Sequence, residues 1–174
     1  GWFDASTNLL YQNDELDEVT FGGNTRTRVW DVSDLENPVL VNEFGAGVPS
    51  IDHNLYTRDG FIYQANYRSG LRIFDARTDP VNPIEVGFFD TFAADDAPEF
   101  NGAWSVYPYF PSGNVILSDI EGGLFVLDPK YALNGGTPLE YAFPNGLPDV
   151  VPPAGQAVQV RITGANGFSV APGT

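Results

Sequence analysis

Short apolar runs separated by turn residues recur along the first 130 residues of the chain. The clearest unit holds four such runs, at residues 54–57, 61–65, 71–74 and 84–89. They are rich in the β-branched and aromatic residues that fit a pleated, half-buried surface. Between the first two runs, Asp59-Gly60 can supply the positive φ that a tight hairpin needs. No apolar period of 3.6 residues is sustained, so the pattern predicts an all-β chain of antiparallel four-stranded units.

A short sequence motif that ends in Asp occurs three times, which indicates an internal repeat. It occurs at residues 28–31, 71–75 and 124–128, and the first two copies are followed by Asn-Pro. Asp31 and Asp75 are 44 residues apart, and Asp75 and Asp128 are 53 apart. Both intervals are close to the roughly 40–50 residues of a four-stranded propeller blade. We therefore expect about three β-propeller blades in residues 1–131, with repeats at about 1–47, 48–92 and 100–131.

The flanking units can be aligned with the middle one, but each lacks an evident edge strand. Residues 9–13 and 115–119 correspond to residues 62–66, and residues 104–107 correspond to 53–56. The first unit has no obvious innermost strand, and the third has no outermost strand unless residues 139–142 supply it. A propeller usually closes with four to eight blades, so three blades are expected to be a fragment of a larger propeller.

The composition changes beyond residue 131. Residues 132–156 are rich in Pro and Gly, as expected of an extended linker. Residues 157–162 then alternate between apolar and polar side chains, as a half-buried strand does. We therefore expect residues 157–174 to form the start of a following β-domain or an extended tail.

The chain is strongly acidic, with 23 Asp and Glu against 8 Lys and Arg and a formal net charge of −15. Such a field repels phosphate backbones, which argues against nucleic acid as a partner and favours cations and basic surfaces. Acidity could equally serve only to keep an extracellular or salt-adapted protein in solution. The sequence has no Cys, which excludes disulfides and thiolate chemistry, and no apolar run predicts a membrane span.

The repeat phrases resemble the LVIVD repeat, and the longer pattern resembles the bacterial choice-of-anchor B proteins. The matching stretches lie at residues 52–55, 61–75, 82–83, 87–91, 101–107, 118–119 and 124–126. The resemblance covers roughly residues 8–130. It implies a secreted or cell-surface bacterial β-propeller that is attached by a C-terminal device and whose ligand is generally unknown.

In a propeller, the innermost strands line the central channel, so equivalent residues at their starts should lie close together. The predicted channel-mouth residues are Asp52, His53 and Asn54 together with their counterparts Asn101, Trp104 and Ser105. They could bind a small ligand or a cation, with Trp104 stacking on a sugar ring. Alternatively, Asp52 and His53 satisfy backbone groups between the blades.

Two acidic runs offer oxygen ligands for Ca²⁺, which tolerates irregular geometry. One spans residues 14–18, and the other consists of Asp90, Asp95, Asp96 and Glu99. Neither run matches an EF-hand loop, and solvated loop charge is the alternative. Apart from this Ca²⁺ candidate, no cofactor is evident from the sequence.

The chain lacks a Gly-x-Ser-x-Gly elbow, a His-Glu-x-x-His helix and a phosphate-binding Gly-rich loop followed by Lys. No motif therefore nominates a nucleophile. The leading hypothesis is a non-catalytic secreted or cell-surface propeller module for binding or adhesion to a protein or glycan partner. The alternatives are a structural subunit of an extracellular assembly and a polysaccharide hydrolase whose site lies partly outside this chain.

Overall fold

The computed structural model describes residues 1–134 and 169–170, and in this part the chain forms three four-stranded antiparallel sheets. Sheet 1 consists, in spatial order, of β1 (Trp2–Asp4), β2 (Leu9–Gln12), β3 (Thr27–Asp31) and β4 (Val39–Phe44). Sheet 2 consists of β5 (Asn54–Arg58), β6 (Phe61–Ala65), β7 (Leu71–Asp75) and β8 (Ile84–Phe89). Sheet 3 consists of β9 (Ala103–Tyr107), β10 (Val115–Asp119), β11 (Gly123–Asp128) and β12 (Ser169–Val170).

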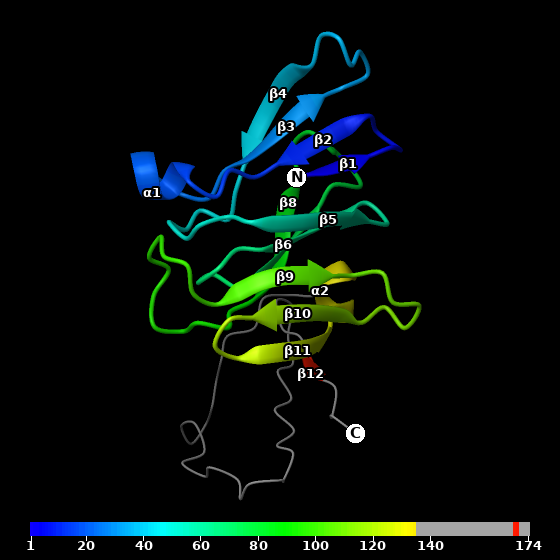
Figure 1. Cartoon of the computed structure of the whole chain (residues 1–174). Helices are drawn as coiled ribbons and strands as arrows, with labels where there is room; N and C mark the ends of the chain where they lie inside the picture. Colours follow the sequence, from blue (N-terminus) through cyan, green and yellow to red (C-terminus); the bar gives the residue numbers. More distant parts are fainter. Residues whose placement is uncertain (135–168, 171–174) are drawn as a thin grey trace, which may run out of the picture.

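The sheets form an open stack in which β1, β5 and β9 lie one above another (Figure 1). Two short helices accompany them, α1 (Asp17–Phe21) in the β2–β3 connection and α2 (Lys130–Leu133) after β11. The prediction of an all-β chain built from antiparallel four-stranded units is confirmed. The four strands predicted in the middle unit are those of sheet 2.

Sheets 1 and 2 share one pairing register. In both, the pairing of the third strand with the fourth shifts at the same place, between Val29 and Trp30 and between Ile73 and Phe74. Trp30 pairs with Leu10 as Phe74 pairs with Ile62. Leu10 is therefore the equivalent of Ile62, one residue away from the alignment expected from sequence. Alternate residues face opposite sides of a sheet. The one-residue shift therefore means that the sequence alignment matched the buried residues of β2 with residues on the opposite face of β6.

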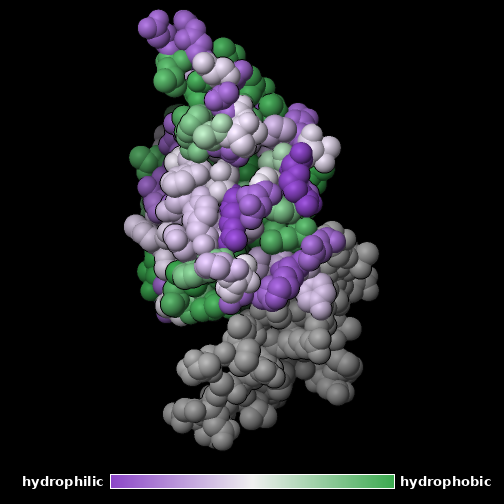
Figure 2. All heavy atoms as spheres, turned by 90° about the vertical axis from the view of Figure 1, so that its right-hand side faces the viewer, coloured by the Kyte–Doolittle hydropathy of each residue, from purple (hydrophilic) through white to green (hydrophobic). Residues whose placement is uncertain are grey.

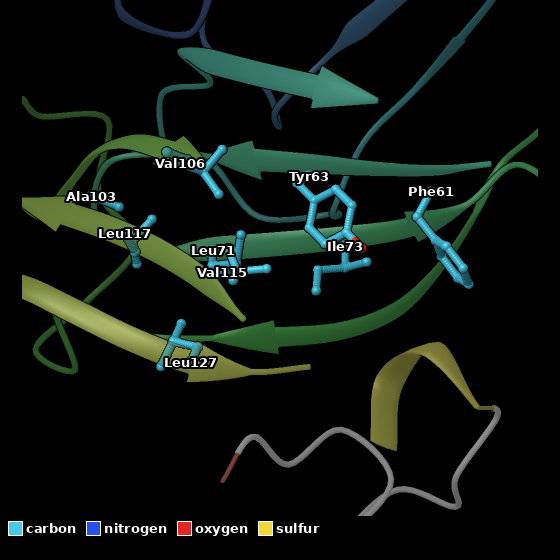
Figure 3. Packing of buried hydrophobic residues seen from close by; sticks show 10 residues of the cluster. Phe61, Tyr63, Leu71, Ile73, Ala103, Val106, Val115, Leu117 and Leu127 are labelled. Atoms are coloured by element: carbon cyan, nitrogen blue, oxygen red, sulfur yellow. The ribbon is translucent and has the colours of Figure 1, made fainter. Parts of the chain in front are cut away.

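The core consists of two layers, one on each face of sheet 2. All five residues of β6 are buried, because successive side chains point to opposite faces and both faces are covered. One layer, between sheets 2 and 3, contains Phe61, Tyr63, Ala65, Leu71, Ile73, Ala103, Val106, Val115, Leu117 and Leu127 (Figure 3). The other layer, between sheets 1 and 2, contains Leu9, Tyr11, Val29, Leu55, Ile62, Phe74 and Ala76.

The structure supplies both edge strands that the sequence left open. Sheet 1 begins with β1, a strand of three residues that pairs with β2. In sheet 3, Ser169 and Val170 pair with Asp128 and Leu127 of β11. Residues 139–142, predicted as a candidate for that place, lie outside the described residues. The linker and following β-domain predicted for residues 132–174 lie mostly outside them too, and both stay predictions.

Because neighbouring strands alternate in direction, five connections lie at the same end of the stack, on the left in Figure 1. We call this end the loop face. It consists of residues 13–26, 45–53, 66–70, 90–102 and 120–122. Connections from all three sheets therefore meet on one face of the molecule.

Candidate functional site

Three aromatic rings lie together at the loop face, those of Tyr67 and Phe100 in its connections and that of Trp104 at the start of β9, and we refer to them as the aromatic cage. The ring centroid of Tyr67 is 5.3 Å from that of Phe100 and 5.9 Å from that of Trp104. The two outer rings stand nearly perpendicular to Tyr67, at 88° and 87°. Tyr67 is 1% exposed, whereas Phe100 and Trp104 are 47% and 49% exposed. The buried ring is thus flanked by two rings that offer aromatic surface to solvent.

The backbone around Tyr67 fixes the position of the cage. Tyr67 has a φ of 37°, and its carbonyl accepts hydrogen bonds from the N–H groups of Gly70 and Ala103. Gly102 approaches the same carbonyl so closely that an added Cβ would lie 2.5 Å from the oxygen. Glycine at residue 102 therefore lets the start of β9, which carries Trp104, pack directly against the β6–β7 connection.

Glu15 and His53 supply the polar groups beside the cage. Glu15 accepts a hydrogen bond from the Tyr67 hydroxyl, and its Oε1 lies 3.1 Å from Nδ1 of His53. The His53 ring is 4.9 Å from that of Trp104 and 5.1 Å from that of Tyr67, centroid to centroid. Burial lowers the pKa of His53, although Glu15 opposes the shift. A carboxylate paired with a neutral imidazole therefore borders the aromatic cage.

The structure brings together two of the predicted pairs of channel-mouth residues. His53 contacts Trp104, as described above, and Asn54 contacts Ser105. The Ser105 hydroxyl and the Val106 N–H donate to Oδ1 of Asn54, at 3.1 and 3.3 Å. These hydrogen bonds hold β9 against β5, so Asn54 and Ser105 join neighbouring sheets.

Asp52 has the structural role that was predicted as the alternative to ligand binding, because it satisfies backbone groups. It is fully buried, and its two carboxylate oxygens accept the backbone N–H groups of Asp14 and Arg26 at 3.0 and 2.9 Å. Burial raises the pKa of Asp52 to about 7, and these two hydrogen bonds oppose that shift. Asp52 therefore holds the β2–β3 connection in place instead of facing the cage.

Asn101 and the second acidic run surround Arg68. The Arg68 guanidinium donates to Asp95 at 2.6 Å, to Asn101 at 2.7 Å and to Glu99. Asn101 donates in turn to Glu121 at 2.7 Å. A guanidinium thus occupies carboxylate oxygens that a Ca²⁺ ion would need.

The described residues contain no group of three or more His, Asp and Glu side chains that could hold a metal ion. Asp90 accepts the N–H of Phe92 at 2.8 Å, and its neighbours Asp95 and Glu99 are paired with Arg68. In the first acidic run, Asp17 is paired with arginines as well. In the described part of the chain, Asp90, Asp95, Asp96 and Glu99 are therefore not gathered into a group that could hold a Ca²⁺ ion.

A buried acid cluster, consisting of Asp17 and Glu18, lies in the first turn of α1. Asp17 and Glu18 are 3% and 2% exposed, and Oδ2 of Asp17 accepts from Arg26 and Arg28 at 2.8 and 3.0 Å. Burial, the charge of Asp52 and a hydrogen bond with Asp17 raise the pKa of Glu18 to about 8. Protonated Glu18 can donate to Asp17, whose Oδ1 has no other donor. A pKa of about 8 leaves Glu18 largely protonated at neutral pH.

Sequence reasoning found His53 and Trp104, named Glu15 only within an acidic run offered for Ca²⁺, and missed Tyr67 and Phe100. Glu15, Tyr67 and Phe100 lie in connections of sheet 1, sheet 2 and the link between sheets 2 and 3, so their proximity depends on how the sheets stack. The one available signal was an aromatic residue in the short turn between β6 and β7, where small and polar residues are usual.

The loop face also concentrates negative charge. Its five connections contain two arginines, Arg26 and Arg68, and ten carboxylates: Asp14, Glu15, Asp17, Glu18, Asp52, Asp90, Asp95, Asp96, Glu99 and Glu121. The five connections of the described ranges at the opposite end contain four carboxylates: Asp34, Glu36, Asp59 and Asp79. At that opposite end, hydrophilic residues are interspersed with neutral and hydrophobic ones (Figure 2).

A second aromatic cluster lies at the opposite end of the inner strands. Its rings are those of Trp2, Tyr56, Tyr107, Tyr109 and Phe110, with centroid separations of 4.7–6.4 Å. No Asp or Glu is hydrogen-bonded to the described side chains of this cluster, whereas Glu15 is bonded to the cage. Among the described residues, the two aromatic clusters therefore differ in that only the aromatic cage has a carboxylate hydrogen-bonded to it.

Comparison with known protein families and with curated proteins finds no match to this chain. Among the described residues, no helix is long and apolar enough to cross a membrane. The candidate site is thus defined by its own geometry: two exposed rings over a buried one, a carboxylate beside them and an acidic surround. Such a site can bind and orient a ligand.

Proposed function

We propose that this chain is a non-catalytic binding module of a secreted or cell-surface bacterial protein, and that it binds a protein or glycan partner through the loop face. The observation that carries the proposal is the aromatic cage beside Glu15 and His53. Exposed aromatic rings next to a few convergent polar groups are the usual composition of a binding site. The resemblance to the LVIVD repeat and to choice-of-anchor B proteins supports the cellular setting.

We further propose that the three sheets are consecutive blades of a larger β-propeller. Support comes from the outward face of sheet 1, where Leu10 and Trp30 take the positions that Ile62 and Phe74 take in sheet 2. Ile62 and Phe74 are buried against sheet 1, whereas Trp30 is only half-buried. The outward face of sheet 1 is therefore apolar in the same way as a face that is packed.

The outward face of sheet 3 supports the same proposal. Its cross-strand row of Tyr107, Ile116 and Val126 carries apolar groups, and Tyr107 and Val126 are exposed. On sheet 2, the corresponding face buries Tyr63 and Ile73 against sheet 3. Further blades on both sides would cover these rows. The same apolar rows favour the second candidate function, a structural subunit of an extracellular assembly.

Binding is favoured over hydrolysis of a polysaccharide by the placement of the paired carboxyl groups. Glycosidases need two carboxyl groups that reach the same glycosidic bond. Asp17 and Glu18 are paired but buried, and Asp17 is held by Arg26 and Arg28. A substrate on the loop face would meet Glu15, whose carboxylate is already engaged by His53 and Tyr67.

Replacing Trp104 by alanine is expected to weaken ligand binding by about tenfold, because about half of its ring is free to stack on a ligand. The measurement is binding of the purified chain to defined oligosaccharides and to acidic and basic peptides on a surface. Tyr107→Ala is the matched control, since Tyr107 is an exposed ring at the other end of β9. Equal binding by both variants, or release of sugar products by the wild-type chain, would contradict the proposal.

A further inference from the structure

The aromatic cage offers exposed aromatic surface next to a carboxylate. Phe100 and Trp104 are each about half exposed and stand nearly perpendicular to Tyr67, so part of each side chain is free to meet a ligand. The face of an aromatic ring attracts a cation, and tryptophan does so most strongly. Glu15 lies within hydrogen-bond distance of the Tyr67 hydroxyl at the base of the cage.

Among the described residues, no arginine or lysine forms an ion pair with Glu15. In the described part of the chain, its one ion-pair partner is His53, whose pKa is lowered by burial. Other carboxylates on the loop face do have such cations, since Arg68 pairs with Asp95 and with Glu99. A carboxylate without an arginine or lysine partner, beside exposed aromatic rings, is complementary to a positive charge.

The charges around the aromatic cage also favour a cationic ligand. The loop face has ten carboxylates and two arginines, so its field attracts cations and repels anions. A neutral sugar would gain nothing from this charge. The aromatic cluster at the opposite end has rings too, but it lacks a carboxylate hydrogen-bonded to them among the described residues.

We infer that the aromatic cage binds a cationic group, such as the ammonium group of a lysine side chain in a basic segment of a protein partner. This inference rests on the proposed function and names the chemical class of its ligand. The cation would contact the faces of Trp104 and Phe100 and lie close to the Glu15 carboxylate. The acidic loop face would then attract the rest of the basic segment.

The test uses the fluorescence of Trp104 in the full chain. The sequence has three tryptophans, so Trp2→Phe with Trp30→Phe leaves Trp104 as the single reporter. The probe is a short lysine-rich peptide, and its control is the same peptide with acetylated lysines. We expect saturable change in Trp104 emission with the lysine peptide and at least roughly tenfold weaker binding of the acetylated peptide.

Two pairs of variants separate the cage from the general acidic field. Phe100→Ala is expected to weaken binding several-fold, whereas Phe110→Ala, in the opposite cluster, is expected to leave it unchanged. Glu15→Gln is expected to weaken binding more than Asp96→Asn, which removes the same charge from the same face. Equal effects of Glu15→Gln and Asp96→Asn would overturn the inference, because the field alone would then account for binding.

The same titration distinguishes failure of this inference from failure of the proposed function. If a neutral oligosaccharide changes Trp104 emission and the lysine peptide does not, the cage is a sugar site and the cation inference is wrong. The binding function of the loop face would then stand. If no oligosaccharide or peptide of the panel changes Trp104 emission while the variants remain folded, both proposals are wrong.

Discussion

The folded protein is expected to lose several kcal/mol of stability as the pH rises from about 5 to about 9. Burial and neighbouring carboxylates raise the pKa of Glu18 from its ordinary value near 4.5 to about 8. Burial likewise raises the pKa of Asp52 to about 7. Between the unfolded and folded values, the folded state holds protons that the unfolded state releases. Stability is therefore full below the unfolded pKa and falls as the pH rises from there through the folded pKa, at about 1.4 kcal/mol per pKa unit.

The carboxylates whose pKa is lowered do not offset this loss of stability at rising pH. Burial raises the pKa of Asp17, but a hydrogen bond from Arg26 and the charges of Arg26 and Arg28 hold it below its ordinary range. Hydrogen bonds from Ala97 N–H and Arg68 do the same for Asp95. Groups with a lowered pKa contribute stability that is lost only at acidic pH, below the range compared here.

Glu18→Gln isolates the main contribution to this pH dependence. It keeps the size of the side chain and its ability to donate to Asp17, but it cannot ionise. The variant is expected to be more stable than the wild type at pH 9 and to show a flatter profile, measured by urea denaturation across the range. Glu36→Gln is the control, because Glu36 is exposed. A wild-type slope in Glu18→Gln would contradict the account of the acid cluster.

Phe74→Ala is expected to cost about 3–5 kcal/mol of unfolding free energy, because it leaves a cavity between sheets 1 and 2. Phe74 is buried, and its ring centroid lies 4.9 Å from that of Phe44 in sheet 1. The measurement is equilibrium unfolding in urea at a fixed pH.

The matched control is Trp30→Ala, which changes the equivalent position of sheet 1. Trp30 faces outward and is half-buried, and its indole N–H donates to Gln12 at 2.8 Å. Its loss should cost less than that of Phe74, because little surrounding structure closes over it. Equal losses for the two variants would show that the two positions are packed alike and would contradict the outward assignment of Trp30.

The parts of the fold that were predictable are those with a local signal. The Asp59-Gly60 turn has φ values of 52° and 76°, as the hairpin signal required, and it fixed the pairing of β5 with β6. The continuous apolar run of β6 matched a strand with both faces covered. By contrast, β1 has only three residues, and the pairing of Ser169 with Asp128 joins distant segments. No local sequence pattern predicts the strand β1 or the pairing of Ser169 with Asp128.

The candidate site was predictable only in part, because its members come from different sheets. The correspondence of His53–Tyr56 with Trp104–Tyr107 placed His53 near Trp104, since both start inner strands. Glu15 reaches the same place through the β2–β3 connection, whose path depends on hydrogen bonds to Asp52. Likewise, the acidic run around Asp95 could not reveal that Arg68 would occupy it.

The most direct test of ligand binding at the loop face is a two-dimensional NMR titration of the isotope-labelled full chain with the lysine-rich peptide and with a neutral oligosaccharide. The account predicts that the amide and indole shifts induced by a bound probe are confined to the loop face and the start of β9, around Glu15, His53, Tyr67 and Trp104. Shifts centred instead on the opposite cluster around Tyr56 and Tyr107 would contradict it, as would a folded chain with no shifts from either probe.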